Sequence, residues 1–282
     1  MMPGSLVETI GLRFAPEQLE AVRAARQDIG FFEVDAEDYM GDGGPYRSRL
    51  AELRATCDLS VHSGGLAIGA LVPLDRAYLA QLAALCDGCQ PALVSEHLAW
   101  ASPGIAGSAA RIRPYSRLTL DLAVEHVQAV QLRLGRRLLI ETPVTCAEPC
   151  GGALDEGPFL RGLAEGAGCG LLLDLGNVYV TARALGRDPL EHLRTLPLDH
   201  VGEIHLPAAG SPVLTCSLTR LAAPDIEIMR ALYGWVVHTA GPIPTILDWE
   251  GTLPAFEVLS AGRARAARVT LDAKEERDVR AL

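Results

Sequence analysis

Residues 158–180, PFLRGLAEGAGCGLLLDLGNVYV, contain the structural unit that decides the fold of this chain. The first part, PFLRGLAEGAG, has the apolar spacing of an amphipathic helix and ends at glycine, which commonly stops a helix. An apolar run, predicted as a strand over 170–175, follows and leads to Asp174. A buried strand that ends in a carboxylate costs stability unless that group is paired or bound to a metal. The unit therefore joins a helix, a buried strand and a polar group at the strand's end.

The same alternation of helical patterns and apolar runs continues along the chain. Besides 170–175, we predict strands near 8–13, 31–36, 59–63, 92–98, 137–142, 200–206 and 244–249. Eight near-continuous apolar strands separated by helical patterns predict an α/β fold, a (β/α)8 TIM barrel with its helices outside. We predict a single catalytic domain over 1–282, with the barrel at about 8–260 and a charged surface helix with a frayed tail at 261–282.

The composition argues against several classes of protein. A formal net charge of −10 disfavours a nucleic-acid partner, because such sites need a basic surface. No apolar run reaches the roughly 18 residues of a membrane span, so we expect no membrane partner. We find no secretory signal, and we interpret the seven loosely spaced cysteines as reduced thiols of a cytoplasmic protein.

Acidic or imidazole side chains stand at the ends of six of the predicted strands. They are His62, Glu96, His97, Glu141, Asp174, His205 and Asp248. The carboxyl ends of the strands form the active site of such a barrel, so we expect these groups to converge. Buried, unpaired polar groups would be costly, whereas histidine and carboxylate ligands suit iron, manganese or zinc. The pattern therefore predicts a polynuclear metal site.

Two residues have particular places in this hypothesis. Glu141 comes from the middle of the ring of strands. It is the candidate bridge, because a shared carboxylate can hold two metals about 3.5–4 Å apart. Asn177 follows Asp174 in DLGN, where its amide oxygen could be a neutral ligand.

An acidic turn follows the second predicted strand in FFEVDAEDYM, residues 31–40. Carboxylates so close together repel one another unless a cation or an arginine lies nearby. We expect Glu37 and Asp35 at the outer part of the site, where either could orient substrate or move protons; a solvated acidic turn is the alternative. The chain has no G-x-S-x-G elbow, G-x-G-x-x-G fingerprint or P-loop, so we predict neither serine-nucleophile chemistry nor a nucleotide cofactor.

Several motifs resemble those of one known family. They are FEVDAEDYM, LSVHSGG, QPALVSEHLAW, LLIETP, GCGLLLDLGNVYV, VGEIHLP and GPIPTILDWE. Together they resemble the multinuclear non-heme iron-dependent oxidative enzymes (MNIO), formerly domain of unknown function 692 (DUF692), over roughly residues 8–260. SEHLAW, GCGLLLDLGNVYV and VGEIHL are the most specific of these motifs.

The resemblance implies a xylose-isomerase-like TIM barrel with two or three irons and O2 as co-substrate. Family members oxidatively modify residues, often cysteines, of ribosomally made precursor peptides (RiPP biosynthesis), frequently with a small partner protein that recruits the peptide leader. By motif, His62 and Glu96 would bind one iron, Glu141 would be shared, and His97 would be a ligand or a neighbour of one. The residues that would complete the pair are Asp174, Asn177, His205 and Asp248.

The chain departs from the family's usual pattern where a third iron is ordinarily held. Ala209 stands in place of a second histidine after EIHL, and Thr219 and Leu221 stand near the place of a later D-x-H pair. The combined loss predicts a centre of two irons. The last strand ends DWE rather than EWD, so either Asp248 reaches the metal after a shift or Glu250 takes its place.

We therefore predict an O2-dependent, di-iron oxidase or oxygenase that modifies a residue, in the first place cysteine, of a ribosomally made peptide or a related small substrate. One alternative is a redox-inert dinuclear isomerase or hydrolase on the same barrel. Another is a degenerate scaffold that binds a partner. One observation argues against the scaffold, because decay would not spare one side of a cluster: the persistence of His62, Glu96, Glu141, Asp174 and His205.

Overall fold

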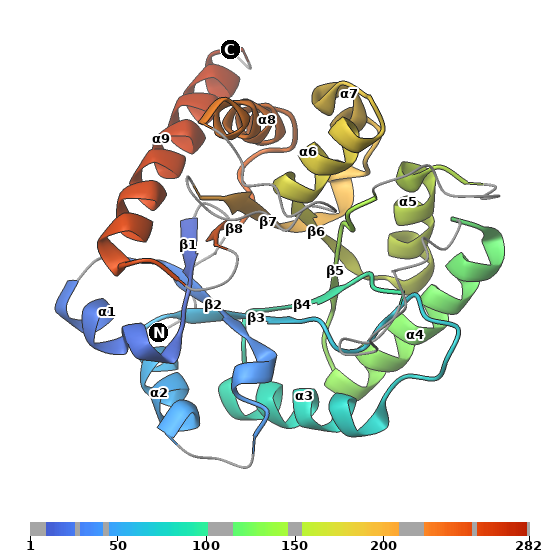
Figure 1. The fold of residues 1–282 in the computed structure, drawn as a ribbon, viewed down its shortest axis with the longest axis horizontal. Coiled ribbons are helices and arrows are strands. Elements are labelled where there is room, and N and C mark those ends of the chain that lie inside the picture. Colours follow the sequence, from blue (N-terminus) through green and yellow to red (C-terminus); the bar gives the residue numbers. More distant parts are fainter. Residues whose placement is uncertain are drawn as a thin grey trace.

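The computed structural model describes residues 10–25, 29–41, 45–100, 115–145, 154–208, 223–249 and 253–280. Its eight strands form a closed barrel in which every strand is parallel to both neighbours, in the order β1 to β8 (Figure 1). The strands are β1 (Ile10–Arg13), β2 (Phe31–Asp35), β3 (Asp58–Ser63), β4 (Leu93–His97), β5 (Leu139–Glu141), β6 (Gly170–Asp174), β7 (Val201–Pro207) and β8 (Thr245–Asp248). Each overlaps a predicted strand, and the TIM-barrel prediction is confirmed.

Helices surround the barrel on its outside (Figure 1). They are α1 (Leu19–Ala25), α2 (Pro45–Arg54), α3 (Arg76–Cys89), α4 (Arg117–Leu134), α5 (Glu156–Ala167), α6 (Leu175–Ala184), α7 (Pro189–Arg194), α8 (Ala223–Ala240) and α9 (Phe256–Arg280). Gly135 and Gly168 end α4 and α5 with φ of 64° and 67°, a conformation that glycine adopts without steric cost. The stop at Gly168 was predicted from sequence and is confirmed.

Alternation along the strands sorts side chains between the barrel interior and the helix layer. Ser60 Oγ on β3 donates a hydrogen bond to Glu203 Oε2 on β7 across the barrel, at 3.0 Å. His205, two residues after Glu203, therefore lies on the same interior face, one layer nearer the strand ends. The intervening Ile204 is fully buried in the core. The interior thus has a polar layer at the strand ends and another two residues earlier.

The C-terminal helix completes the ring of helices. α9 packs against β1, β8 and α8, which joins the end of the chain to its beginning. Leu259 and Ala266 on α9 are buried, and Gly262 allows the helix to approach Leu247 on β8. Residues 261–280 of the charged segment predicted as a surface helix and tail thus belong to the continuous helix α9, which begins at Phe256.

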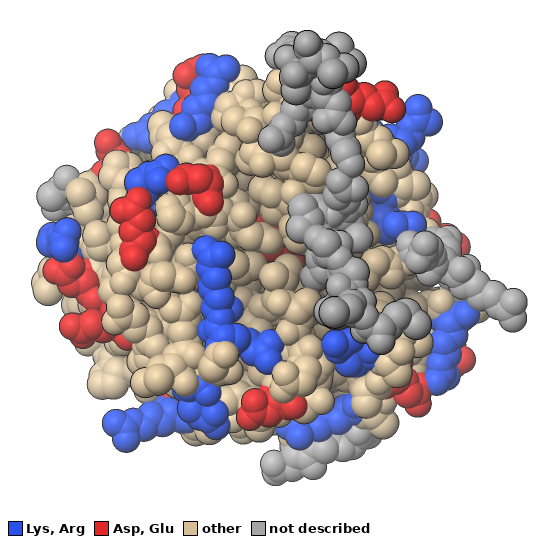
Figure 2. Space-filling model, turned by 180° about the vertical axis from the view of Figure 1, so that it is seen from behind, with Lys and Arg blue, Asp and Glu red and all other residues tan. Residues whose placement is uncertain are grey.

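The distribution of charged residues on the surface and the hydropathy of the helices bear on the possible partners of the protein. On the face shown in Figure 2, acidic and basic residues are interspersed, and the described residues form no continuous basic field. Within the described ranges, no helix combines the length and the apolar character that crossing a bilayer requires.

Two helical glycines provide a test of this packing. A Cβ on Gly157 in α5 would lie 2.0 Å from the backbone oxygen of Thr195, whereas one on Gly88 in α3 would meet nothing within 4 Å. We expect Gly157→Ala to lower the free energy of unfolding by about 1–3 kcal/mol through overpacking. Gly88→Ala should raise it by about 0.5–1 kcal/mol, because alanine loses less backbone entropy. Urea unfolding measures both, and equal effects would contradict the packing of α5.

Candidate metal centre

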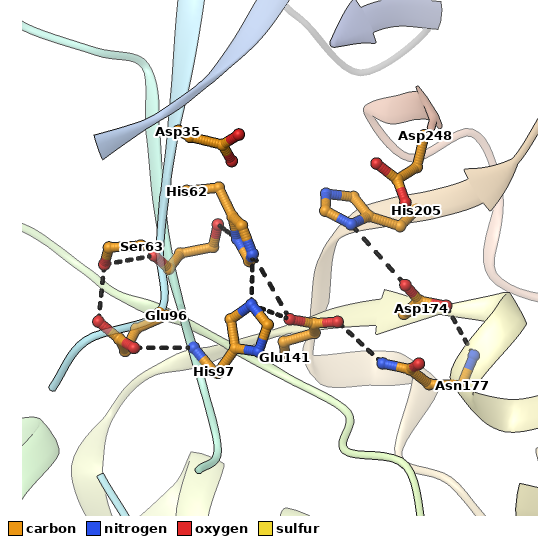
Figure 3. A network of polar contacts seen from close by, with 12 residues as sticks. Asp35, His62, Ser63, Glu96, His97, Glu141, Asp174, Asn177, His205 and Asp248 are labelled. Carbon is orange, nitrogen blue, oxygen red and sulfur yellow. Dashed lines mark hydrogen bonds and ion pairs between the residues drawn. The ribbon is translucent and has the colours of Figure 1, made fainter. Parts of the chain in front are cut away.

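Two groups of metal-ligating atoms lie at the carboxyl ends of the strands and share one carboxylate. The first group comprises His62 on β3, His97 on β4 and Glu141 on β5. The two Nε2 atoms are 2.8 Å apart, and Glu141 Oε2 lies 3.6 Å from His62 Nε2 and 3.1 Å from His97 Nε2. Figure 3 shows the three side chains pointing toward one another. Two imidazoles and a carboxylate that converge in this way can hold one metal ion.

His62 is prepared as a neutral ligand. Its Nδ1 lies 2.8 Å from Ser95 Oγ, which orients the ring and leaves Nε2 to face His97. Burial lowers the pKa of His62 well below its ordinary value, and the charges of His97, His205 and Arg13 lower it further. A metal-binding imidazole must be unprotonated, so this environment favours ligation.

The second group comprises Glu141, Asp174 at the end of β6 and His205 on β7. Asp174 also caps α6, since its Oδ1 accepts a hydrogen bond from the backbone N–H of Asn177 at 2.7 Å. Its Oδ2 lies 3.9 Å from His205 Nδ1. Burial, and next the charge of Glu141, raise the pKa of Asp174 to about 7. A cation between these groups would relieve the repulsion that raises this pKa.

Glu141 lies between the two groups, as expected of a bridge. Its Oε2 faces His62 and His97, while its Oε1 accepts a hydrogen bond from Asn177 Nδ2 at 2.9 Å. The same amide nitrogen donates to the backbone oxygen of Thr142, also at 2.9 Å. Asn177, predicted as an oxygen ligand, is therefore brought to the site with its nitrogen toward Glu141.

Glu96 is placed differently from the other expected ligands. It is fully buried, and its Oε2 accepts a hydrogen bond from Ser63 Oγ at 2.7 Å. Figure 3 shows it turned away from Glu141. No group of candidate ligands in the described part of the chain includes Glu96, whereas one includes the adjacent His97. The reason is the two-residue period of β4, which puts Ser95 and His97 on one face and Glu96 on the other.

Arg13 on β1 connects two acidic residues at the rim of the site. It donates a hydrogen bond to Asp248 Oδ1 at 2.9 Å and another to Asp35 Oδ1. Although burial opposes ionisation of Asp248, the charges of Arg13 and then His205 outweigh it and lower the pKa of this carboxyl. Asp248, predicted as a metal ligand, is thus an ion-pair partner of Arg13 beside the second group. Glu250, the other residue considered for that role, lies outside the described residues.

Glu37 lies in the outer part of the site. It belongs to the 3-10 helix Ala36–Asp38, and its Oε1 accepts a hydrogen bond from the backbone N–H of Gly64 at 3.0 Å and another from Tyr78 OH. Gly64 is packed against His97, because a Cβ built on it would lie 3.4 Å from that ring. Glu37 therefore supports the loop after β3 at the place where that loop covers His97.

Sequence reasoning did not select Arg13 or Ser95, although each has a signal in the sequence. Ser95 precedes His97 by two residues and so shares its face, and Arg13 ends the first predicted strand. His126 on α4 contacts the backbone oxygen of Ile68 at 2.9 Å, and His192 on α7 lies 3.3 Å from the Glu156 carboxylate. The three substituted positions of the third-iron region, Ala209, Thr219 and Leu221, lie outside the described residues.

The chain matches a known family over most of its length. Residues 9–271 match the family described as RiPP precursor modification enzyme MbnB/TglH/ChrH. The chain belongs to this family. It is the family of multinuclear non-heme iron-dependent enzymes that the motifs resemble, and the resemblance is confirmed.

The chain is also 36% identical to a UPF0276 protein of Rhizobium meliloti over 93% of its own length and 86% of that protein. It is 37% identical to a UPF0276 protein of Paraburkholderia phytofirmans, over 93% and 87% of the two chains.

Solved structures confirm the fold. L-ribulose 3-epimerase aligns with a TM-score of 0.63 at 16% identity, covering 97% of this chain and 98% of the epimerase. A xylose isomerase-like TIM-barrel protein from Mycobacterium smegmatis, in complex with magnesium, aligns with a TM-score of 0.58 at 17% identity, over 92% and 88% of the two chains. At such identities these likenesses establish a xylose-isomerase-like TIM barrel and nothing about the reaction.

The positions of Glu96 and His97 predict opposite effects on metal content. Burial raises the pKa of Glu96 to about 8, so this group is largely protonated at pH 7 and glutamine replaces it with little change. We expect Glu96→Gln to keep the wild-type metal content and His97→Ala to lose about one ion per chain. Elemental analysis of the purified variants tests this. If Glu96→Gln loses metal while His97→Ala keeps the wild-type metal content, Glu96 is a metal ligand and His97 is not.

The buried acids also predict how the metal-free protein responds to pH. The pKa values of Asp174 and Glu96 are raised to about 7 and about 8, and that of His205 is raised by Glu33 despite its burial. The folded state therefore binds more protons than the unfolded state, and stability falls as pH rises from 6.5 to 8.5. His62 opposes this only near the lower end of the range, because its pKa is lowered in the folded state, whereas an unfolded histidine still binds part of a proton at about pH 6.5.

Urea unfolding of chelator-treated protein across this range measures the effect. Added metal replaces the bound protons, so its stabilisation should grow with pH. A metal-free stability that rises from pH 6.5 to 8.5 would contradict the protonated carboxyls.

Proposed function

We propose that this protein is an O2-dependent non-heme iron oxidase or oxygenase that holds two irons and modifies a residue, in the first place cysteine, of a ribosomally made precursor peptide. The observation that carries the proposal is the single carboxylate of Glu141 shared by two sets of ligand atoms. Membership of a precursor-modifying family supports the substrate class. A small leader-binding partner and a cytoplasmic location belong to the same proposal.

The donor set fits iron. Each group offers nitrogen from histidine and oxygen from carboxylate, and no cysteine lies in either group. Such mixed ligands suit iron in both its ferrous and ferric states. His62 and His97 with Glu141 would hold one ion, and Asp174 and His205 with the same Glu141 would hold the other. Bound iron would supply the electron transfer and O2 chemistry that protein side chains lack.

The chain's own residues would position the substrate and limit access of water. His62, Glu141 and His205 are buried, whereas the His97 side chain is 48% exposed, so substrate would approach from the His97 side. Glu37, held beside the His97 loop, and Asp35, held by Arg13, are the polar groups suited to orient a substrate amide or to accept its proton.

A different reaction class makes use of the same ligands. Histidine and carboxylate also bind manganese and zinc, so a redox-inert dinuclear isomerase or hydrolase is the alternative. Two ions rather than three are proposed because Ala209, Thr219 and Leu221 bring no strong ligand to the third-iron region. The degenerate scaffold predicts a third outcome, in which the purified protein binds no metal.

Metal analysis with Mössbauer spectroscopy on anaerobically purified, iron-grown protein tests the proposal. We expect about two coupled irons per chain that O2 oxidises, because one bridging carboxylate joins two sites. Three irons would show that other residues replace the missing ligands. Zinc or manganese with activity under anaerobic conditions would favour the isomerase or hydrolase. Less than one ion per chain after anaerobic reconstitution would favour the scaffold.

The shared ligand is tested by Glu141→Ala with His126→Ala as its control. Removing Glu141 withdraws a charged ligand from both sites, so most of the metal should be lost. His126 Nδ1 contacts the backbone oxygen of Ile68, and within the described residues His126 belongs to no group of candidate ligands, so its variant should keep the wild-type metal content. Glu141→Ala with full metal content would contradict the bridge.

A further inference from the structure

A second polar layer lies beneath the candidate ligands, two residues earlier in the strands. Ser60 precedes His62, Ser95 precedes His97, and Glu203 precedes His205 by two residues each. Glu33 on β2 belongs to this layer, two residues before Asp35, and like Glu203 it is fully buried. The layer contains two fully buried carboxylates, which are costly to remove from water unless they have a specific partner. Its members are thus candidates for supporting the metal centre.

Glu33 contacts His205 directly. Glu33 Oε2 lies 2.9 Å from His205 Nε2, between strands that are not neighbours in the barrel. A carboxylate accepts hydrogen bonds, so this contact requires a proton on Nε2 of the ring. His205 is then left with Nδ1 for a metal, and Nδ1 is the atom that faces Asp174 Oδ2, at 3.9 Å.

His62 has the opposite arrangement. Its Nδ1 contacts Ser95, and its Nε2 faces His97 and Glu141. The partner of the remote nitrogen thus determines which nitrogen each histidine presents. The partner of His62 is a neutral hydroxyl, whereas that of His205 is a carboxylate, which makes the ring a more basic ligand.

We propose that Glu33 is a positioning residue that fixes His205 as an Nδ1 metal ligand and strengthens metal binding at the group containing Asp174. This inference rests on the metal centre of the proposed function, but not on its substrate or on O2. Glu33 itself would remain one layer below the metal, in contact with Nε2 of His205.

Glu203 provides a matched comparison within the same layer. It is as buried as Glu33, and burial together with the charge of Glu33 raises its pKa to about 8. Its Oε2 accepts a hydrogen bond from Ser60 Oγ at 3.0 Å, and Ser60 is not a candidate ligand. The variants Glu33→Gln and Glu203→Gln each replace a fully buried carboxyl by an amide of the same shape, and only the first alters the partner of His205.

Anaerobic titration of the metal-free full-length chain with Fe(II), and separately with Co(II), tests the proposal. We expect Glu33→Gln to weaken binding of one of the two ions by about 10–100-fold, the usual effect of losing the carboxylate partner of a ligating histidine. The other ion should bind as in wild type. Glu203→Gln should bind both ions within about threefold of wild type, and thermal unfolding of the metal-free variants checks that each is folded.

A measurement on the wild-type chain keeps the proposal testable even where a variant fails to fold. Proton NMR of the Co(II)-loaded protein in H2O should show a shifted, exchangeable N–H of His205 that disappears in D2O. Its nuclear Overhauser pattern should identify it as Nε2–H, since Nδ1 would be bound to the metal. An Nδ1–H signal from His205 would overturn the proposal.

The remaining outcomes separate this proposal from the proposed function. Two ions bound at wild-type affinity in Glu33→Gln would refute the role of Glu33 and leave the centre intact. Complete loss of one ion, with another kept at full affinity when Glu33 is replaced by either glutamine or alanine, would make Glu33 itself a ligand. This is a real alternative, because Glu33, His62 and His205 also lie close enough to share an ion. No metal bound by the wild type would refute the centre.

Discussion

Burial of several carboxylates at one end of the barrel is the constraint on which the rest of the site depends. Glu141, Asp174 and Asp248 are all nearly inaccessible to water, and their charges act on one another or on His205. Charged groups in such surroundings must be paired, protonated or bound to a cation. The structure combines these solutions: Arg13 pairs with Asp248, the N-terminus of α6 stabilises Asp174, and two histidines face Glu141.

The different partners of these buried carboxylates indicate where a cation would bind. Asp248 already has a fixed positive partner, so it needs no metal to be ionised. Asp174 accepts a hydrogen bond from the backbone of Asn177 and lies 3.9 Å from His205, and its pKa remains raised. Glu141, which faces both groups, has on one side the imidazole of His62, which burial keeps unprotonated. The carboxylates of Glu141 and Asp174 therefore lie together beside the histidines, where the ligand atoms converge.

Because side chains alternate between the two faces of each strand, the centre consists of two layers of side chains. Side chains two residues apart share a face, so each ligand at a strand end lies above a residue that can orient it. Ser95 below His97 reaches the neighbouring His62, and Glu33 reaches His205 across the barrel. Metal-binding histidines commonly donate their other N–H to such partners. The strands of the barrel hold the residues of both layers.

Much of the fold and site could be predicted from local sequence. Apolar runs, glycine stops and polar strand ends are local features, and the barrel architecture brings strand ends together, so the convergence of His62, Glu141, Asp174 and His205 followed from sequence. The partners of Asp248 and His205 did not, because Arg13 and Asp248 are 235 residues apart and Glu33 and His205 are 172 apart. Only barrel closure, which sets β1 beside β8, and the register across its interior decide these pairs.

The role of Glu96 also depended on the tertiary structure, because a strand end does not by itself show which of two adjacent polar residues, Glu96 or His97, faces the interior. The sequence alone thus determined which groups gather at the barrel's mouth, and tertiary packing decided which of them face one another, because pairing energies depend on distances that only the closed barrel sets.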